Sequence, residues 1–196
     1  PYTSCNEQVS ELTFNKFKCN KYLKSLGFLV PKGEIVTTNI VNTQFPCIIK
    51  PSCSGSSFGI NKVYNTHELI AAIKEAKKYS NDVIKEEFID GREVTCAVYN
   101  INNTINTLPL TEIISENDIF DYDAKYNGKS IEKTPAEISI DLTQKIQETS
   151  KKLYISLKLS GIVRMDYIIN TKLAPYLIEI NTIPGFSDNS IVPQML

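Results

Sequence analysis

Residues 163–181, VRMDYIINTKLAPYLIEIN, predict two strands joined by a short polar turn. Charged or amide side chains alternate with apolar ones in both strands. These polar positions are Arg164 and Asp166 in the first strand and Glu179 and Asn181 in the second. Because alternate side chains project from one face of a strand, each pair shares a face, and neighbouring strands would bring the two pairs together.

Two carboxylates and an amide oxygen beside an arginine are suited to a magnesium site. Mg²⁺ prefers hard oxygen ligands, commonly one or two carboxylates together with substrate phosphates, and arginine binds phosphate oxygens well. The alternative is a pair of solvated strand faces with cross-strand ion pairs. Apolar neighbours such as Met165 and Ile180 favour a buried sheet, in which charges need partners. The residues alone leave both interpretations open.

The remaining periodic segments predict an α+β fold with antiparallel sheets and helices packed on them. Helices are expected at about 14–26 with Thr13 as N-cap, after Thr66 as N-cap, and at about 142–159. Further strands are expected at 45–50, 60–64, 83–89, 93–99 and 107–114. Short connections predict that the strands between 83 and 114 pair antiparallel with one another. Residues 115–135 lack periodicity and are a candidate functional loop.

Composition narrows the class of protein. The chain has 196 residues, 42% of them hydrophobic and 22% charged, which is typical of a globular protein. A net charge of −1 gives no indication of a nucleic-acid or membrane partner. Five cysteines without a C-x-x-C pair and a single histidine argue against thiolate or histidine metal sites, so any metal should have oxygen ligands. The sequence contains neither a secretory signal pattern nor a membrane-length apolar run, and it begins with Pro1, so we expect a cytoplasmic protein and part of a longer one.

A small-residue loop follows Lys50, PSCSGSSFG at 51–59. Its backbone N–H groups could turn toward an anion, although such loops more often only connect strands, and it is not a Walker A sequence. Glu86 and Glu93 could accept hydrogen bonds from a nucleotide, or could lie on a solvated edge strand. Lys16 is one of several helix lysines that could simply coat a solvated face.

Five separated motifs occur together in order along the chain. They are PCIIKPS with GSSFG (46–52 and 55–59), EEFI with GRE (86–89 and 91–93), YDAKY (122–126), RMD (164–166) and EINTIPG (179–185). Together they resemble the D-alanine:D-alanine ligases of the ATP-grasp superfamily, from about Lys16 to Leu196. The resemblance implies an ATP-grasp fold in which two α+β subdomains with antiparallel sheets clamp ATP. It predicts subdomains at 1–110, with a core at about 10–95, and at 111–196, with a mobile loop at 115–130, and it implies that the family's N-terminal domain and last helix are absent.

The resemblance also assigns roles to individual residues. Those implied to bind ATP are Lys16 and Lys50 at phosphates, Ser56 and Ser57 over the γ-phosphate, Glu86, Glu87 and Ile89 at adenine, Glu93 at ribose, and Lys125. Those implied to bind two Mg²⁺ or Mn²⁺ ions are Asp166, Glu179 and Asn181. Arg164, Lys125, Tyr126 and Ser56 are the implied catalytic residues, and Arg164, Gly185, Ser190 and Ile191 the implied substrate contacts.

The implied activity is ATP-dependent joining of two D-alanines through an acyl phosphate, for peptidoglycan precursor synthesis, by a cytoplasmic homodimer that has only small-molecule substrates. Tyr126, where D-lactate-incorporating relatives have phenylalanine, favours D-alanine as the second substrate. Two alternatives remain. One is another ATP-grasp carboxylate–amine ligase acting with D-lactate or a different D-amino acid, and the other is a non-catalytic nucleotide-binding module.

Overall fold

The computed structural model describes residues 3–37, 43–115 and 130–196. The helices are α1 (Glu7–Phe14), α2 (Lys16–Ser25), α3 (Thr66–Ala76), α5 (Ile140–Ser156) and α6 (Ile191–Gln194). The strands are β1 (Gly33–Ile35), β2 (Cys47–Pro51), β3 (Asn61–Val63), β4 (Val83–Glu87), β5 (Gly91–Ile101), β6 (Thr104–Thr107), β7 (Thr111–Ser115), β8 (Ser130–Lys133), β9 (Val163–Asn170) and β10 (Pro175–Asn181). The strands form two sheets, and within the described residues the pairings among β1 to β7, β9 and β10 are antiparallel, which confirms the predicted α+β class.

The chain divides into two compact units, which we name by their sheets. The four-stranded unit comprises Phe14–Ile89 and Ser115–Ile131, and the six-stranded unit comprises Pro1–Thr13, Asp90–Ile114 and Glu132–Leu196. These compact units do not correspond to the predicted subdomains at 1–110 and 111–196. The two divisions describe different things, so the subdomain boundary between 110 and 111 stays a prediction. None of the helices in the described ranges is both long and apolar enough to cross a membrane.

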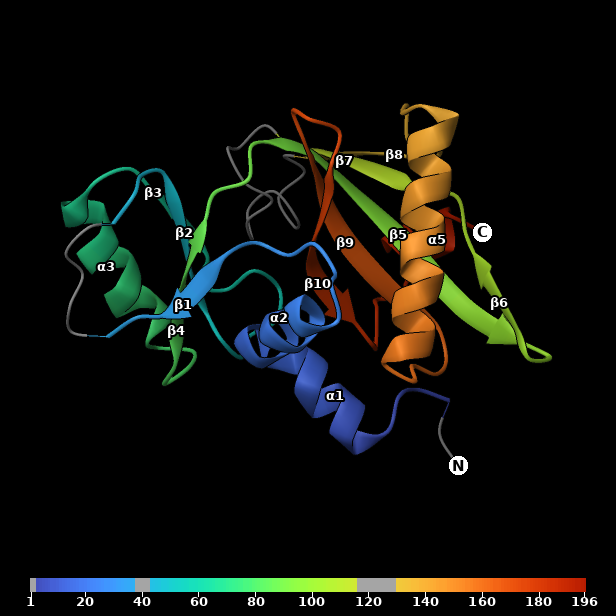
Figure 1. The fold of residues 1–196 in the computed structure, drawn as a ribbon, viewed down its shortest axis with the longest axis horizontal. Coiled ribbons are helices and arrows are strands. Elements are labelled where there is room, and N and C mark those ends of the chain that lie inside the picture. The colour runs from blue at the N-terminus through green and yellow to red at the C-terminus, as the bar shows by residue number, and fades with distance from the viewer. Residues whose placement is uncertain (1–2, 38–42, 116–129) are drawn as a thin grey trace. The chain divides into compact units, whose positions relative to one another are not determined.

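In the four-stranded unit the strand order is β1-β4-β2-β3 (Figure 1). Helix α3 covers one face, where its apolar stripe meets buried residues of three strands. This core consists of Cys47, Ile49, Val63, Leu69, Ala72, Ala76 and Val83. Because side chains alternate across the sheet, Lys50 and Glu86 project from the opposite face. The packing of α3 thus leaves Lys50 and Glu86, two of the predicted nucleotide residues, on the other side of the sheet.

In the six-stranded unit the order is β10-β9-β5-β7-β8, with β6 paired to β5 (Figure 1). Helix α5 packs on one face, where the hydroxyls of Ser150 and Tyr167 lie 2.7 Å apart. Since Tyr167 is directly next to Asp166 along β9, Asp166 projects from the face that α5 does not cover. The alternation in 163–181 therefore divides the side chains between the sheet face that α5 covers and a polar face on the other side.

Several sequence expectations about the elements were wrong. The predicted helix at 14–26 is preceded by a separate helix, α1, which contains Thr13, and the N-cap of α2 is Asn15, whose side chain accepts from the Lys18 amide. Helix α3 is likewise capped by Asn65, one residue before Thr66. In each case a neighbouring asparagine supplies the capping oxygen.

The strand predictions had a larger error. The strands at 83–89 and 93–99 do not form a hairpin: β4 pairs with β1 and β2, and β5 pairs with β6, β7 and β9. Gly91 begins β5 and passes so close to β9 that a Cβ there would collide with the Ile169 carbonyl. The predicted strand at 107–114 is two strands, β6 and β7. By contrast, β9 and β10 both lie within the predicted segment 163–181, and they pair antiparallel as neighbours.

Candidate functional site

The strands β9 and β10 bring the four polar residues of 163–181 together. Glu179 lies opposite Asp166 in the register, and Asn181 lies opposite Arg164. A register shift between Leu177 and Glu179 puts Glu179 and Asn181 in these positions. Directly opposite residues share a face, so both carboxylates, the amide and the guanidinium lie on the face that α5 leaves uncovered.

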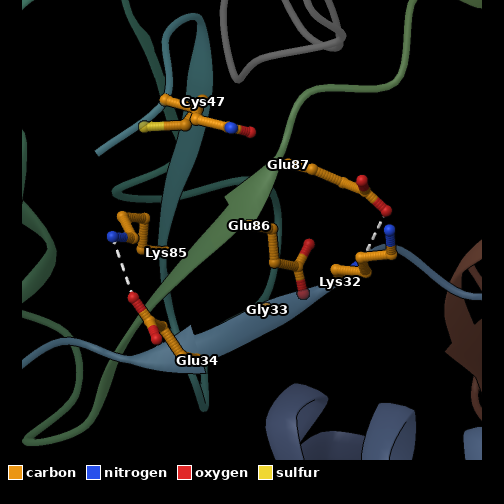
Figure 2. A pocket seen from close by; sticks show the side chains of 8 residues that line it. Lys32, Gly33, Glu34, Cys47, Lys85, Glu86 and Glu87 are labelled. Atoms are coloured by element: carbon orange, nitrogen blue, oxygen red, sulfur yellow. Dashed lines mark hydrogen bonds and ion pairs between the residues drawn. The ribbon is translucent and has the colours of Figure 1, made fainter. Parts of the chain in front are cut away.

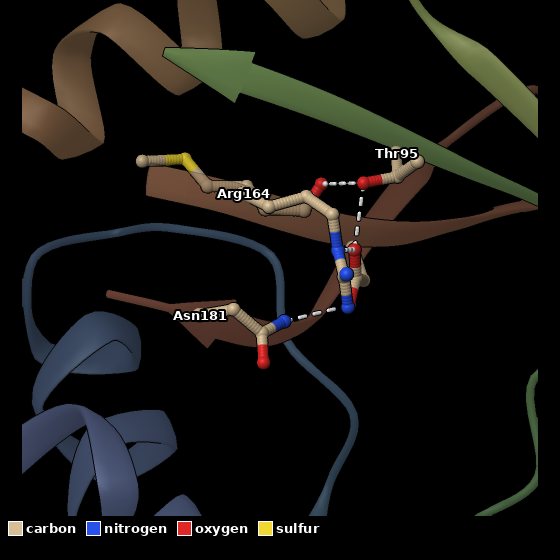
Figure 3. Close-up of polar contacts among 5 residues, drawn as sticks. Thr95, Arg164 and Asn181 are labelled. Atoms are coloured by element: carbon tan, nitrogen blue, oxygen red, sulfur yellow. Dashed lines mark hydrogen bonds and ion pairs between the residues drawn. The ribbon is translucent and has the colours of Figure 1, made fainter. Parts of the chain in front are cut away.

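The side chains of Thr95, Arg164 and Asn181 lie close together (Figure 3), and each donates to the carboxylate of Asp166. Arg164 donates two hydrogen bonds to its carboxylate, from Nε at 2.8 Å and from Nη2 at 2.9 Å. Asn181 Nδ2 donates at 2.8 Å, and the Thr95 hydroxyl on β5 donates at 2.7 Å. Asp166 is only 7% exposed, so the cluster provides the partners that a buried carboxylate needs.

The charges around Arg164 are predominantly negative. Burial by itself disfavours the charged guanidinium, but Asp166, Glu179 and Glu93 hold the pKa of Arg164 well above its ordinary value. Glu93, on β5, is thus part of the electrostatic environment of the same face. The guanidinium remains a permanent cation there.

The donor set fits a magnesium ion in its chemistry. Asp166 and Glu179 supply carboxylate oxygens, and Asn181 supplies an amide oxygen while its Nδ2 is bonded to Asp166. Within the described ranges, no group of three or more His, Cys, Asp or Glu side chains is arranged to hold a metal. Two carboxylates with further oxygens from phosphate is nevertheless the usual composition of a magnesium–nucleotide site. The protein would therefore supply only a few of the metal ligands at this site.

A second cluster lies on the four-stranded sheet. Lys50 Nζ on β2 forms an ion pair with Glu86 Oε2 on β4 at 2.6 Å, and both side chains are 4% exposed. Asn20 Nδ2, from α2, donates to Glu86 Oε1 at 3.1 Å. Two of the predicted nucleotide residues are thus brought into direct contact.

Lys16 lies at the first position of α2 and is buried, unlike the solvated lysine considered as the alternative. Its Nζ donates to the Ser54 carbonyl at 2.6 Å, which ties the helix to the small-residue loop. In that loop Ser56 and Ser57 have φ of 50° and 57°, two consecutive residues in the left-handed region. Such strain in non-glycine residues is typical of functional loops.

An open pocket of about 280 Å³ lies at the edge of this sheet, between β1 and the ends of β2 and β4 (Figure 2). Glu87 contributes to its wall and accepts a hydrogen bond from the Lys32 amide at 2.8 Å. Lys85 reaches across to Glu34, with its Nζ 2.8 Å from Oε1. Ile89 follows β4 and is half-buried. Glu86, Glu87 and Ile89, which the resemblance places at adenine, therefore lie in and just after one strand.

The segment after β10 holds the other predicted substrate residues. The Ser190 hydroxyl accepts from the Ser187 amide at 3.1 Å, and a Cβ at Gly185 would lie only 2.8 Å from the Ser190 Oγ. Ile191 is buried at the start of α6. Gly185 and Ser190 are therefore in close contact. Lys125 and Tyr126, together with most of the predicted loop, lie outside the described residues.

Comparison with known proteins shows the family of the chain. The family described as D-ala D-ala ligase C-terminus matches residues 21–196. The chain belongs to this family. It is 48% identical to a D-alanine–D-alanine ligase of Flavobacterium johnsoniae over 99% of its length, and 44% identical to one of Parabacteroides distasonis over all of it. In both comparisons the chain spans 62% of the relative's length.

Solved ligases of this family have the same fold. The VanG D-Ala:D-Ser ligase of Enterococcus faecalis matches the whole chain and 60% of its own, with 35% identity and a TM-score of 0.88. A D-alanine–D-alanine ligase of Bacillus anthracis complexed with ATP matches the whole chain and 63% of its own, with 26% identity and a TM-score of 0.82. The ATP-grasp fold implied by the sequence motifs is thereby confirmed.

Beside the predicted site residues the structure shows contacts that sequence reasoning missed. Thr95 contacts Asp166, Asn20 contacts Glu86, and Gly33 on β1 lies directly opposite Glu86. For Thr95 a signal existed, because it is two residues after Glu93 and so shares its face of β5. Asn20 lies one helical turn after Lys16, which was also a usable signal.

Proposed function

We propose that the chain is the ATP-binding and catalytic part of a D-alanine:D-alanine ligase, which joins two D-alanines with hydrolysis of ATP to ADP and phosphate. The observation that carries the proposal is the convergence of Arg164, Asp166, Glu179 and Asn181 on one sheet face of a chain that belongs to this family. We further propose that the whole protein is a cytoplasmic homodimer and serves peptidoglycan precursor synthesis, as the family resemblance implies.

The chemistry begins with a carboxylate, which is a poor electrophile at neutral pH. Its activation requires phosphoryl transfer from ATP to give an acyl phosphate, which the amine of the second D-alanine then attacks. Most of the catalysis in such a transfer is positioning and charge stabilisation. The chain offers cations for this task in Lys16, Lys50 and Arg164.

In the four-stranded unit we assign ATP recognition. Lys16 and Lys50 neutralise phosphate charge, and the backbone of the loop around Ser56 and Ser57 covers the γ-phosphate. Glu86 accepts from the adenine amino group, with Glu87 and Ile89 in the adjoining segment. Support comes from the burial of Lys16, Lys50 and Glu86 and from the left-handed loop residues.

In the six-stranded unit we assign the chemical step. Asp166, Glu179 and Asn181 hold two Mg²⁺ or Mn²⁺ ions, which when bound offset the charge of the ATP phosphates. Arg164 stabilises the negative charge on the transferring phosphoryl group and on the tetrahedral intermediate. Glu93 binds ribose, and Gly185, Ser190 and Ile191 border the second substrate. Lys125 and Tyr126 complete the site from the loop.

The second amino acid is the point on which relatives differ, because one similar structure is named a D-Ala:D-Ser ligase. Tyr126 supports D-alanine in place of D-lactate, and the two curated relatives described above are named for D-alanine. The test is phosphate release and product analysis by the whole protein with ATP, Mg²⁺ and D-alanine, alone and with D-serine or D-lactate. D-alanyl-D-alanine as the main product supports the proposal. A mixed dipeptide or an ester as the main product would favour the other ligase, and nucleotide binding without any product would favour the non-catalytic module.

A further inference from the structure

Glu86 is held from two sides by residues of different elements. Lys50 Nζ lies 2.6 Å from Oε2, and Asn20 Nδ2 lies 3.1 Å from Oε1. Asn20 comes from α2, on the same helix face as Lys16, because the two are four residues apart. A single helix therefore positions both the loop, through Lys16, and the acidic side chain, through Asn20.

The opposite strand leaves room for this orientation of Glu86. Gly33 faces Glu86 across β1 and β4, and a Cβ at Gly33 would lie 2.7 Å from Glu86 Cγ. No other residue type could occupy position 33 without moving the acid. The sheet and α2 together thus define where the carboxylate lies.

The proposed function requires a change of partners at this carboxylate. If Lys50 binds phosphate, its ammonium leaves Oε2 of Glu86, and the buried carboxylate loses its cation. Asn20 then remains as a donor to Oε1. A carboxylate only accepts hydrogen bonds, so Oε2 would favour the exocyclic amine of adenine and disfavour the 6-oxo group of guanine.

We infer that Asn20 is a positioning residue for base selection: it fixes Glu86 so that Oε2 recognises the 6-amino group of ATP. This inference rests on the proposed assignment of Glu86 to adenine. Without the Asn20 amide, Lys50 is the main partner of the Glu86 carboxylate, and the carboxylate can move with the Lys50 ammonium when that group binds phosphate. The 6-amino group then loses a fixed acceptor, while phosphate binding is unaffected.

The experiment compares ATP with purine riboside triphosphate, which lacks the 6-amino group, and with GTP. Affinities for the whole protein with Mg²⁺ are measured by titration calorimetry, which needs no turnover. In Asn20→Leu, the preference for ATP over purine riboside triphosphate should fall by about tenfold, the scale for one lost buried polar contact. Asn20→Gln, which keeps the amide, should restore part of that preference. The matched control is Lys21→Ala, an exposed change on the same helix, which should leave the preference unchanged.

The outcomes separate this inference from the proposed function. An equal loss of affinity for all three nucleotides, with a lower melting temperature, would make Asn20 merely structural and overturn the inference. So would an unchanged preference in Asn20→Leu when Glu86→Gln lowers it. An unchanged preference in both variants would overturn the assignment of Glu86 as well. A lowered preference in a protein that makes no dipeptide would support the inference and refute the proposed function.

Discussion

Thr95→Val should weaken both the fold and the metal site, because it removes one hydroxyl without changing the size of the side chain. Thr95 is fully buried on β5, and its hydroxyl donates to Asp166 Oδ1 at 2.7 Å. A hydrogen bond to a charged acceptor contributes about 1.5–3 kcal/mol. Valine fills the same volume, so no cavity is added to that figure. We expect the free energy of unfolding to fall by about 1.5–3 kcal/mol.

The same variant has a second expected effect. Asp166 retains Arg164 and Asn181 as partners, but the hydroxyl no longer fixes its Oδ1. Loss of such an outer partner lowers metal affinity by roughly tenfold to a hundredfold. Urea denaturation followed by circular dichroism gives the stability. Mn²⁺ binding followed by electron paramagnetic resonance gives the affinity.

The matched control is Thr149→Val on α5. It removes a hydroxyl that donates only to the Lys145 carbonyl in an exposed setting, and such changes usually alter stability by less than about 0.5 kcal/mol. A Thr95→Val protein with unchanged Mn²⁺ affinity, and with a loss of stability no larger than that of the control, would refute the reasoning. It would mean that the hydroxyl does not orient Asp166.

Three further predictions address the metal, the substrate and pH. Glu179→Ala should abolish the Mg²⁺ dependence of ATP binding measured by calorimetry, and unchanged affinity together with unchanged activity would make the metal assignment wrong. Tyr126→Phe should raise D-lactate use relative to D-alanine by the equivalent of roughly 1–3 kcal/mol, since it removes one polar partner of the attacking amine; a constant ester-to-amide product ratio would contradict this. Burial raises the pKa of Cys96 from 9.0 to about 12, so the thiol ionises first in the unfolded state. The free energy of unfolding should therefore fall as the pH rises from 9 toward 12. In urea titrations, Cys96→Ala should make that fall shallower. An identical pH dependence in both proteins would refute the attribution of this fall to the Cys96 thiol.

The polar face of β9 and β10 could be predicted from sequence because it depends only on local alternation. Arg164 and Asp166, like Glu179 and Asn181, are two residues apart, and a strand has a period of two. The turn between the strands is short, which is compatible with the antiparallel pairing of β9 and β10 that the structure shows. Neither step needed information from elsewhere in the chain.

The pairing of β4 and β5 could not be predicted in the same way. A three-residue connection is compatible with a hairpin, but it equally allows the chain to pass from one sheet into another. What decides is the close approach of Gly91 to β9, more than 70 residues later in the sequence. The residue types in the connection between β4 and β5 do not predict that contact.

Thr95 and Asn20 were missed for a related reason. Thr95 is 71 residues from Asp166, and Asn20 is 66 residues from Glu86. Their chemical types are ordinary on a strand and on a helix, and they become informative only when the register between distant elements is known. Residues that support a functional side chain are therefore harder to predict than the side chain itself.

Both units show the same electrostatic arrangement at their proposed sites. Lys50 is paired with Glu86 in one, and Arg164 with Asp166 in the other, each at 2.8 Å or less. Buried charges need partners whether or not a ligand is bound, and Lys50 and Arg164, two of the cations proposed to bind phosphate, are each paired with a carboxylate proposed to bind adenine or metal. Binding of nucleotide and metal must then exchange these partners, and cannot simply add new contacts to an empty surface. The free energy of binding is consequently smaller than the sum of the new contacts. Asn20 and Thr95 donate to these carboxylates in the structure, and a residue that kept such a bond during the exchange would influence affinity without touching the ligand.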